Sequence, residues 1–409
     1  MVPHIKQVRI RNYKSIGQLS VNLEPFTVLV GPNGSGKSNF IDALSFVKDC
    51  LADSLESAFR KRGGIGAVRR RSAGHPTSIE ISIIMDLGNS ELASYSFKIS
   101  AMFEKKFEVA FERCEVHGLL RKQNEFRIEK GQFVKEIPGI RPKVSLDRLG
   151  LYAASATEEF RPVYDFLTSM RFYSIIPKEL RELQESDTGD YLDREGSNAA
   201  AILKRLKEDK QLSWRYERLC SLLSKVVQGI KKVEYHAVGQ KETIQIKQDV
   251  GTKHPWTFDA LNMSDGTLRI LGLLLAVYQP GFHSVIAIEE PESTVHPAVT
   301  ELIIEVLMDA ANERQVLITT HSPDILDYKY IKDSQIKIVT IENYSTLIAS
   351  LSQSSREAIR QHLYTAGELL RSGELTPDIE TAKEESAKQL RLFPSQSRAK
   401  NEFGNSPHS

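Results

Sequence analysis

Residues 31–38 read Gly-Pro-Asn-Gly-Ser-Gly-Lys-Ser and directly follow the apolar run 26–30. This is the pattern GxxxxGK[ST], in which glycines let successive backbone N–H groups turn inward and cradle phosphate oxygens. Lys37 can reach the β- and γ-phosphates, and Ser38 can offer its hydroxyl to Mg²⁺. Residues 38–51 carry apolar side chains at helical spacing, so the loop opens a helix whose positive N-terminus faces the phosphates. The segment therefore predicts a nucleoside triphosphate site between a strand and a helix.

The bulk composition excludes several classes of protein. The chain has 409 residues, 41% hydrophobic and 26% charged, which is an ordinary globular mixture and allows about two or three domains. A net charge of +1 makes no global demand for nucleic acid or an anionic membrane. Three scattered cysteines form neither a zinc pattern nor a disulfide framework. The longest apolar run, 270–278, is about half a membrane span, so we expect a cytoplasmic protein with no direct membrane contact.

The order of predicted elements changes along the chain. Strand-like alternation in 4–30 is followed, after the first helix, by β-type segments that predict an antiparallel lobe. Helical composition then dominates 155–230, and from residue 268 helices and strands alternate, which predicts a parallel sheet. We expect four regions: an N-terminal lobe 1–150, a helical insertion 151–232, a C-terminal lobe 233–373 and a polar, disordered tail 374–409.

An apolar strand at 284–288 ends in a run of acids. In a P-loop ATPase the first acid, Glu289, would hold Mg²⁺ or its water shell. The second, Glu290, would polarise the attacking water. The same pattern also fits a helix cap or a solvated turn, and glutamate stands at position 289 where aspartate is commoner.

Two further segments have polar residues at positions suited to phosphate. His321 follows the apolar run 316–319 and would donate a hydrogen bond to a γ-phosphate, although a lone histidine is usually structural. Ser264 and Gly266 precede the predicted helix 268–278, where backbone N–H groups and a hydroxyl can bind phosphate. The alternative interpretation of that second segment is a plain helix N-cap.

Together these segments resemble the ABC-type ATPases of the SMC/RecF group, and more closely the stand-alone ATPases related to the overcoming-lysogenization-defect (OLD) proteins. The similarity spans most of 4–370. It is carried by 10–16, 31–38, 263–267, 289–292 with 295–297, and 320–323. The resemblance implies an α/β fold: an ABC-type P-loop head with an antiparallel β lobe, a parallel-sheet core and a helical insertion.

The resemblance also implies a head-to-head homodimer that sandwiches two ATP molecules with Mg²⁺. It assigns catalysis to Lys37, Glu290 and His321, and the metal to Ser38 and Glu289. Asp265 and Thr267 depart from the usual residues of the signature motif, and Gln123 and Gln184 are the two candidates for the Q-loop glutamine. The implied nucleotide-binding residues are Gly31, Asn33, Gly34, Ser35, Gly36, Lys37, Ser38 and Asn39 of one subunit, with Ser264 and Gly266 of the other.

Relatives of this kind suggest a dimeric ATP-hydrolysing switch that controls a separately encoded effector, such as a nuclease or toxin, in bacterial anti-phage defence. In OLD-type proteins a TOPRIM nuclease domain follows the ATPase. Too few residues follow His321 here for such a domain, and 324–327 lacks a DxD metal pair. We therefore expect any nuclease to act in trans.

Alternatives to this switch remain open. A DNA-repair or DNA-clamping ATPase would use Arg69, Arg70 and Arg71 as a contact loop, although a charge run is more often solvated. A nucleotide-binding scaffold would bind ATP without turnover. A transporter ATPase subunit is disfavoured because the interval from Lys37 to Ser264 is too long. Assembly of dimers into a higher oligomer is also left open.

Overall fold

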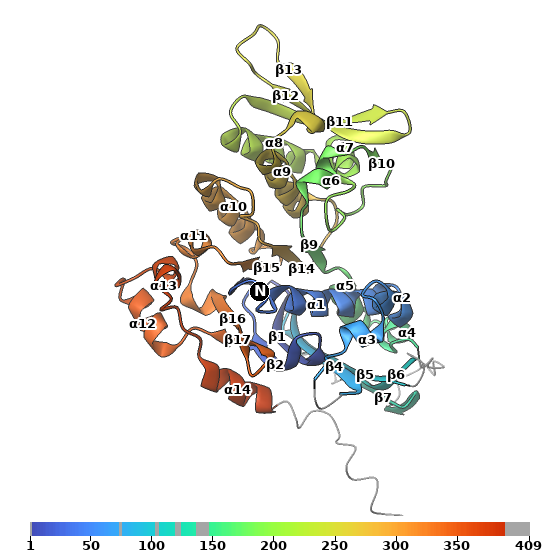
Figure 1. Cartoon of the computed structure of the whole chain (residues 1–409). Helices are drawn as coiled ribbons and strands as arrows, with labels where there is room; N and C mark the ends of the chain where they lie inside the picture. The colour runs from blue at the N-terminus through green and yellow to red at the C-terminus, as the bar shows by residue number, and fades with distance from the viewer. Residues whose placement is uncertain (1, 73–75, 103–105, 119–123, 136–146, 389–409) are drawn as a thin grey trace, which may run out of the picture.

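The computed structural model describes residues 2–72, 76–102, 106–118, 124–135 and 147–388. In this part of the chain, three sheets organise the molecule (Figure 1). A six-stranded sheet and a seven-stranded antiparallel sheet build the body. A small antiparallel sheet lies in an upper lobe with its own helices. The predicted combination of an antiparallel β lobe with a parallel-sheet core is confirmed.

The six-stranded sheet, in the order β17-β16-β3-β15-β14-β9, positions the strand ends that carry the motifs. β3, β14 and β15 pair in parallel, with Thr320 opposite Val30 and Glu289 opposite Thr319. Their carboxyl ends therefore meet at one edge of the sheet. The strands are buried on both faces, as parallel sheets usually are. The six strands are β3 (Phe26–Val30), β9 (Arg171–Tyr173), β14 (Val285–Glu289), β15 (Gln315–Thr320), β16 (Ile336–Glu342) and β17 (Ser345–Ser350).

The antiparallel sheet has the order β2-β1-β4-β5-β6-β7-β8. Along β5, Ala93, Tyr95, Phe97 and Ile99 are buried while their neighbours are not, which is the period of two expected for a strand with one covered face. The seven strands are β1 (His4–Tyr13), β2 (Ile16–Asn22), β4 (Ser78–Gly88), β5 (Glu91–Ala101), β6 (Phe107–His117), β7 (Asn124–Glu129) and β8 (Gln132–Lys135).

The upper lobe combines helices with a sheet of the order β10-β12-β11, in which β13 also pairs with β12. Its apolar helix faces and strands share a core with the six-stranded sheet. Three elements of the predicted insertion 151–232 lie elsewhere: α4 (Leu151–Ala154), α5 (Arg161–Thr168) and β9 belong to the body. The lobe contains α6 (Pro177–Arg181), β10 (Gln184–Glu185), α7 (Ala199–Glu208), α8 (Ser213–Val226), β11 (Ile230–Val238), β12 (Lys241–Gln248), β13 (Trp256–Asp259), η2 (Ala260–Asn262) and α9 (Asp265–Tyr278).

The C-terminal elements pack against the body. The prediction of a disordered tail from residue 374 is wrong for the segment that forms α14, which begins at an Asp378 cap and lies on β2 and β17. Buried Ala382 and Ser386 let this helix approach closely, and Ser20 N donates to Ser386 Oγ over 3.1 Å. Residues 389–409 lie outside the described part. The remaining elements are α10 (Pro297–Ala310), α11 (Pro323–Leu326), η3 (Asp333–Gln335), α12 (Gln353–Arg360), α13 (Ala366–Ser372) and α14 (Ile379–Ala387).

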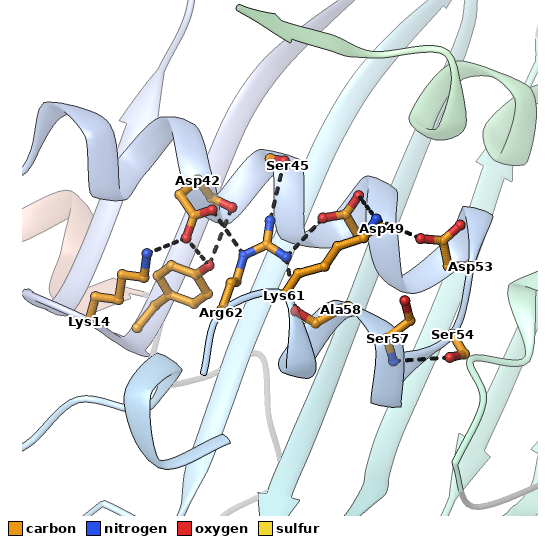
Figure 2. A network of polar contacts seen from close by, with 11 residues as sticks. Lys14, Asp42, Ser45, Asp49, Asp53, Ser54, Ser57, Ala58, Lys61 and Arg62 are labelled. Atoms are coloured by element: carbon orange, nitrogen blue, oxygen red, sulfur yellow. Dashed lines mark hydrogen bonds and ion pairs between the residues drawn. The ribbon is translucent and has the colours of Figure 1, made fainter. Parts of the chain in front are cut away.

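A buried arginine fastens α1 (Lys37–Ala52), the helix that follows the P-loop. Figure 2 shows Arg62, just after α2 (Leu55–Arg60) and before α3 (Ile65–Val68), reaching two aspartates of α1. Arg62 Nε donates to Asp42 over 2.9 Å and Nη1 to Asp49 over 2.8 Å, with only 6% of the side chain exposed. Burial alone would raise the pKa of Asp42, but Arg62 and Lys14 hold it below its usual value. Arg62 therefore acts as a structural clamp on α1.

Within the described residues, no helix is long and apolar enough to cross a membrane.

Replacing Arg62 by alanine should lower the free energy of unfolding by about 3 kcal/mol, because Asp42 and Asp49 then lose a buried partner. Lys61→Ala is the matched control. Lys61 also pairs with Asp49 and Asp53, but 52% of its side chain is exposed, so we expect a loss below about 1 kcal/mol. Urea unfolding of the two variants measures the difference. Equal losses would contradict the clamp.

Candidate nucleotide site

The P-loop has the backbone that its glycines predict. Gly34 and Gly36 have φ of +79° and +103°, a region that glycine enters without the cost of a Cβ. A Cβ at Gly36 would lie 2.0 Å from Thr346 Oγ1, and one at Gly31 would lie 2.1 Å from the carbonyl oxygen of Val339. The loop therefore needs glycine for its turn and for its close approach to β16 and β17. Such turns form concave N–H nests that suit anions.

Lys37 arches back over this loop at the start of α1. Its Nζ donates to the carbonyl oxygens of Gly31 (2.7 Å) and Pro32 (3.1 Å), and the residue is 5% exposed. Burial lowers the pKa of Lys37, while the nearby acids Glu290, Glu292 and Glu289 oppose that shift. Ser38, the next residue, is exposed, and Asn33 and Gly34 are also open to solvent. The ammonium group of Lys37 therefore lies at the carbonyl oxygens of the P-loop, and Ser38 is accessible at the start of α1.

The parallel sheet brings the predicted catalytic residues to one edge. Glu290 follows β14, and its N–H donates to the carbonyl oxygen of Thr319 on β15 over 3.0 Å. His321 follows β15, and its Nδ1 lies 3.4 Å from Glu290 Oε1. Both side chains are more than a third exposed. Gly31 N donates to the carbonyl oxygen of Thr320 over 3.3 Å, so the P-loop shares this edge.

Arg269 is a site residue that the sequence analysis did not identify. It lies in the second turn of α9, is 7% exposed, and donates from Nη2 to the carbonyl oxygens of Glu289 (3.0 Å) and Glu290 (2.6 Å). Its Nη1 donates to the carbonyl oxygen of Ile175, two residues after β9. Glu290 has φ of +47°, which is uncommon outside glycine. Arg269 therefore holds an unfavourable backbone in place. A charged residue within the apolar run of α9 was the available signal, because buried charges require partners.

Arg194 is a second residue that the sequence analysis missed. It lies in a loop of the upper lobe, and its Nη2 is 2.7 Å from Glu289 Oε1. Two hydrogen bonds hold this loop: Arg194 O accepts from Ser174 N over 2.9 Å, and Asn198 Oδ1 accepts from Asp193 N over 2.8 Å. The upper lobe thus presents a cation to the acid predicted to hold the metal.

Glu292 was noted only as part of the acidic run, yet it links two strand ends. Thr320 Oγ1 donates to Glu292 Oε1 over 2.5 Å, and burial raises the pKa of this carboxyl. The contact joins the turn after β14 to the end of β15.

Ser264 and Gly266 lie at the start of α9, a helix of the upper lobe (Figure 1). Ser264 caps α9, and its Oγ accepts from Thr267 N over 3.2 Å, which realises the N-cap interpretation. Arg181 holds the segment by donating to Met263 O and Asp265. Ser264 is nevertheless exposed. No hydrogen bond or ion pair among the described residues joins this segment to the P-loop.

Two other sequence candidates have different outcomes. Gln184 is buried in the upper lobe, where Nε2 donates to Glu179 O and Oε1 accepts from Ala200 N, so it does not reach the strand edge. Gln123 lies outside the described residues. In the arginine run, Arg70 donates to the carbonyl oxygens of Ser15 (2.6 Å) and Tyr344 (2.8 Å) rather than standing in solvent.

A family model described as "AAA domain, putative AbiEii toxin, Type IV TA system" matches residues 26–327, well over half of the chain. The chain belongs to this family. Among curated relatives, the Old nuclease of Escherichia phage P2 is 22% identical over an alignment of 395 residues, which covers 87% of this chain and 63% of that protein. The chromosome partition protein Smc of Methanocaldococcus jannaschii is 24% identical over 244 residues, covering 56% of this chain and 20% of that one. The chain thus spans less than two thirds of either relative.

Solved structures show the same fold. An Smc head domain with an extended coiled coil, bound to the C-terminal domain of ScpA from Pyrococcus furiosus, has a TM-score of 0.53 at 12% identity and covers 88% of this chain and 100% of its own. An SmcHead bound to the C-winged helix domain of ScpA has a TM-score of 0.51 at 15% identity, with coverages of 86% and 99%. This member of the AAA family is therefore an SMC/OLD-like ABC-type ATPase in its fold and sequence family.

The donor set of this family member fits a nucleotide with Mg²⁺. Within the described residues, no group of three or more His, Cys, Asp or Glu side chains could hold a metal alone. Mg²⁺ bound together with phosphates usually takes one or two protein ligands and completes its shell with phosphates and water. Ser38 and Glu289 would supply those ligands, and the N–H groups of the P-loop would face the phosphates.

Replacing Arg194 by alanine should lower the Mg²⁺ concentration needed for ATP binding about 5-fold. In the wild type, Mg²⁺ must displace Arg194 from Glu289, and breaking an ion pair with one exposed partner costs about 1 kcal/mol. Titrating Mg²⁺ against a fluorescent ATP analogue measures this shift. Arg205→Ala removes an arginine of similar exposure in the same lobe, which pairs with Asp190; it is the control and should leave the Mg²⁺ requirement unchanged. An unaltered requirement in Arg194→Ala would refute the competition.

Proposed function

We propose that this chain is an ATP-hydrolysing switch that works as a homodimer with two composite sites. One observation carries the proposal: the parallel sheet brings Lys37, Glu290 and His321 to one edge, while Ser264 is exposed on a separate element. A site shared between two copies requires such a division: each copy supplies the P-loop and the acids of one site, and the signature segment 263–267 of the other.

The proposed roles follow from the side-chain chemistry. The P-loop N–H groups and Lys37 hold and neutralise the phosphates, and Ser38 and Glu289 hold Mg²⁺, which supplies positive charge against the phosphate oxygens. Glu290 orients the attacking water by accepting its hydrogen bond. His321, whose Nδ1 is 3.4 Å from Glu290 Oε1, would donate a hydrogen bond to the terminal phosphate. Arg269 keeps the backbone of Glu290 in place.

Both halves of the proposed interface are open to solvent. Ser264 is exposed just before α9, and Asn33, Gly34 and Ser38 are exposed at the P-loop. A two-fold axis would bring the Ser264 segment of each subunit to the P-loop of the other, because a two-fold interface uses the same surfaces twice.

The effector role rests on the comparisons. The matched family is described by a toxin of a type IV toxin–antitoxin system, and the relative with the greatest coverage of this chain among those reported above is a phage nuclease. We therefore propose that ATP-driven closure moves the upper lobe and controls a separate nuclease or toxin in anti-phage defence. Arg194 and Arg269 connect that lobe to the acids.

The composite site is tested by mixing two inactive chains. Lys37→Ala removes phosphate binding but keeps the signature segment, and Ser264→Arg does the reverse. Each variant alone should be inactive. A 1:1 mixture should recover about a quarter of the wild-type ATPase rate, because half of the dimers are mixed and each contains one intact site. A mixture as inactive as its components would argue against sites shared between subunits.

Glu290→Gln separates the switch from a non-hydrolysing scaffold. Wild type should turn over ATP with a rate per subunit that falls on dilution, and the variant should bind ATP without turnover. Because hydrolysis no longer separates the two subunits, the variant should accumulate ATP-bound dimers. Light scattering after size exclusion measures the dimer fraction. If the wild type does not turn over ATP and behaves like Glu290→Gln, the result would favour the nucleotide-binding scaffold.

A further inference from the structure

The tip of the β16–β17 hairpin carries an aromatic residue in an unusual backbone conformation. Asn343 and Tyr344 form a two-residue turn with φ of +49° and +59°. Such turns favour asparagine followed by glycine, and a bulky side chain with positive φ is an outlier. Tyr344 is nevertheless 93% exposed, the highest value among the large exposed hydrophobic residues of the described chain. Neither packing nor turn geometry accounts for a tyrosine at this position.

The hairpin is fastened directly to the P-loop. Thr346 Oγ1 donates to the carbonyl oxygen of Ser35 over 3.0 Å, and this hydroxyl is the group that leaves no room for a Cβ at Gly36. Two residues of extended chain span at most about 7 Å, so the backbone of Tyr344 lies within that reach of Thr346. The exposed ring therefore stands beside the phosphate-binding loop.

A second set of contacts holds the hairpin tip against the tip of β1 and β2. Arg70 donates to the carbonyl oxygens of both Ser15 and Tyr344, over 2.6 Å and 2.8 Å. Thr346 N donates to Ser15 O over 3.0 Å, and Asn39 Nδ2 of α1 donates to Ser15 Oγ over 2.7 Å. The position of Tyr344 relative to the start of α1 is thus set by polar contacts from three segments.

The strand order of the six-stranded sheet indicates which end of a bound nucleotide would face the tip of the β16–β17 hairpin. β3, which leads into the P-loop, lies between β15 on one side and β16 on the other. Glu290 and His321 lie on the β15 side, so the terminal phosphate must point that way for hydrolysis. A triphosphate lying along the P-loop then directs its nucleoside toward the other flank, where the β16–β17 hairpin stands.

We propose that the ring of Tyr344 stacks on the nucleobase, and that Arg70 holds the backbone of this platform. The inference rests on the proposed nucleotide site and names the group that binds the base end of its ligand. Aromatic stacking tolerates different bases because every base has a π-face. The platform therefore adds affinity while distinguishing adenine from guanine only weakly.

The test compares ATP with inorganic tripolyphosphate, which has the phosphates but no base. Binding is measured by calorimetry in the Ser264→Arg background, so that dimer closure does not contribute. Tyr344→Ala should weaken ATP binding about 5- to 150-fold, the range typical for loss of one stacked base, and leave tripolyphosphate binding unchanged. Tyr344→Phe should bind ATP like the parent. Tyr364→Ala removes a different tyrosine, 57% exposed, and should change neither ligand.

Three results would overturn the inference. Equal weakening of ATP and tripolyphosphate by Tyr344→Ala would mean that the hairpin only shapes the P-loop. Unchanged ATP binding, with weaker dimers when the substitution is placed in Glu290→Gln, would make Tyr344 a protein contact instead. A parent that binds tripolyphosphate as tightly as ATP would remove any role for the base while the phosphate site stands. Because the readout is binding, a chain without ATPase turnover would refute the proposed function and leave this inference intact.

Discussion

The parallel pairing of β3, β15 and β14 is the constraint on which the site depends. Parallel strands in register bring their carboxyl ends to one edge, so three segments far apart in sequence meet there. The P-loop leaves β3, His321 leaves β15 and Glu290 leaves β14. A slip of one residue in any of these pairings would turn the following polar side chain to the other face of the sheet. The buried aliphatic strands thus specify the geometry of the polar edge.

Buried arginines tie the other parts of the molecule to this edge. Arg62 holds α1 through two aspartates, and Arg269 holds the turn at Glu290 through two carbonyl oxygens. Each guanidinium offers several donors in a fixed plane, so one side chain can join elements that share no backbone hydrogen bonds. Arg269 belongs to the same helix that Ser264 caps. We therefore expect a movement of the signature segment to shift the backbone of Glu290, the proposed catalytic residue.

Local motifs with strict residue requirements were predictable from the sequence. The P-loop, the acids after β14 and the α/β alternation from α9 onward follow from glycine geometry and hydrophobic periodicity, and the fold confirms the architecture that they imply. The bonds of Arg194, Arg269 and Arg70 were not predictable, because each joins residues separated by long stretches of chain. Nor did composition predict α14, since its short polar sequence is ordered by packing on β2 and β17.

The contact between Gly36 and Thr346 has a consequence for how the chain is made. The nucleotide loop lies near the N-terminus, but one of its walls is the β16–β17 hairpin, about three hundred residues later. At typical synthesis rates, on the order of tens of seconds separate the appearance of these two segments from the ribosome. During that interval the nascent chain contains the P-loop sequence but not the β16–β17 hairpin that packs against it. Phosphate binding is therefore a late property of the growing chain, gained when its distant parts have docked.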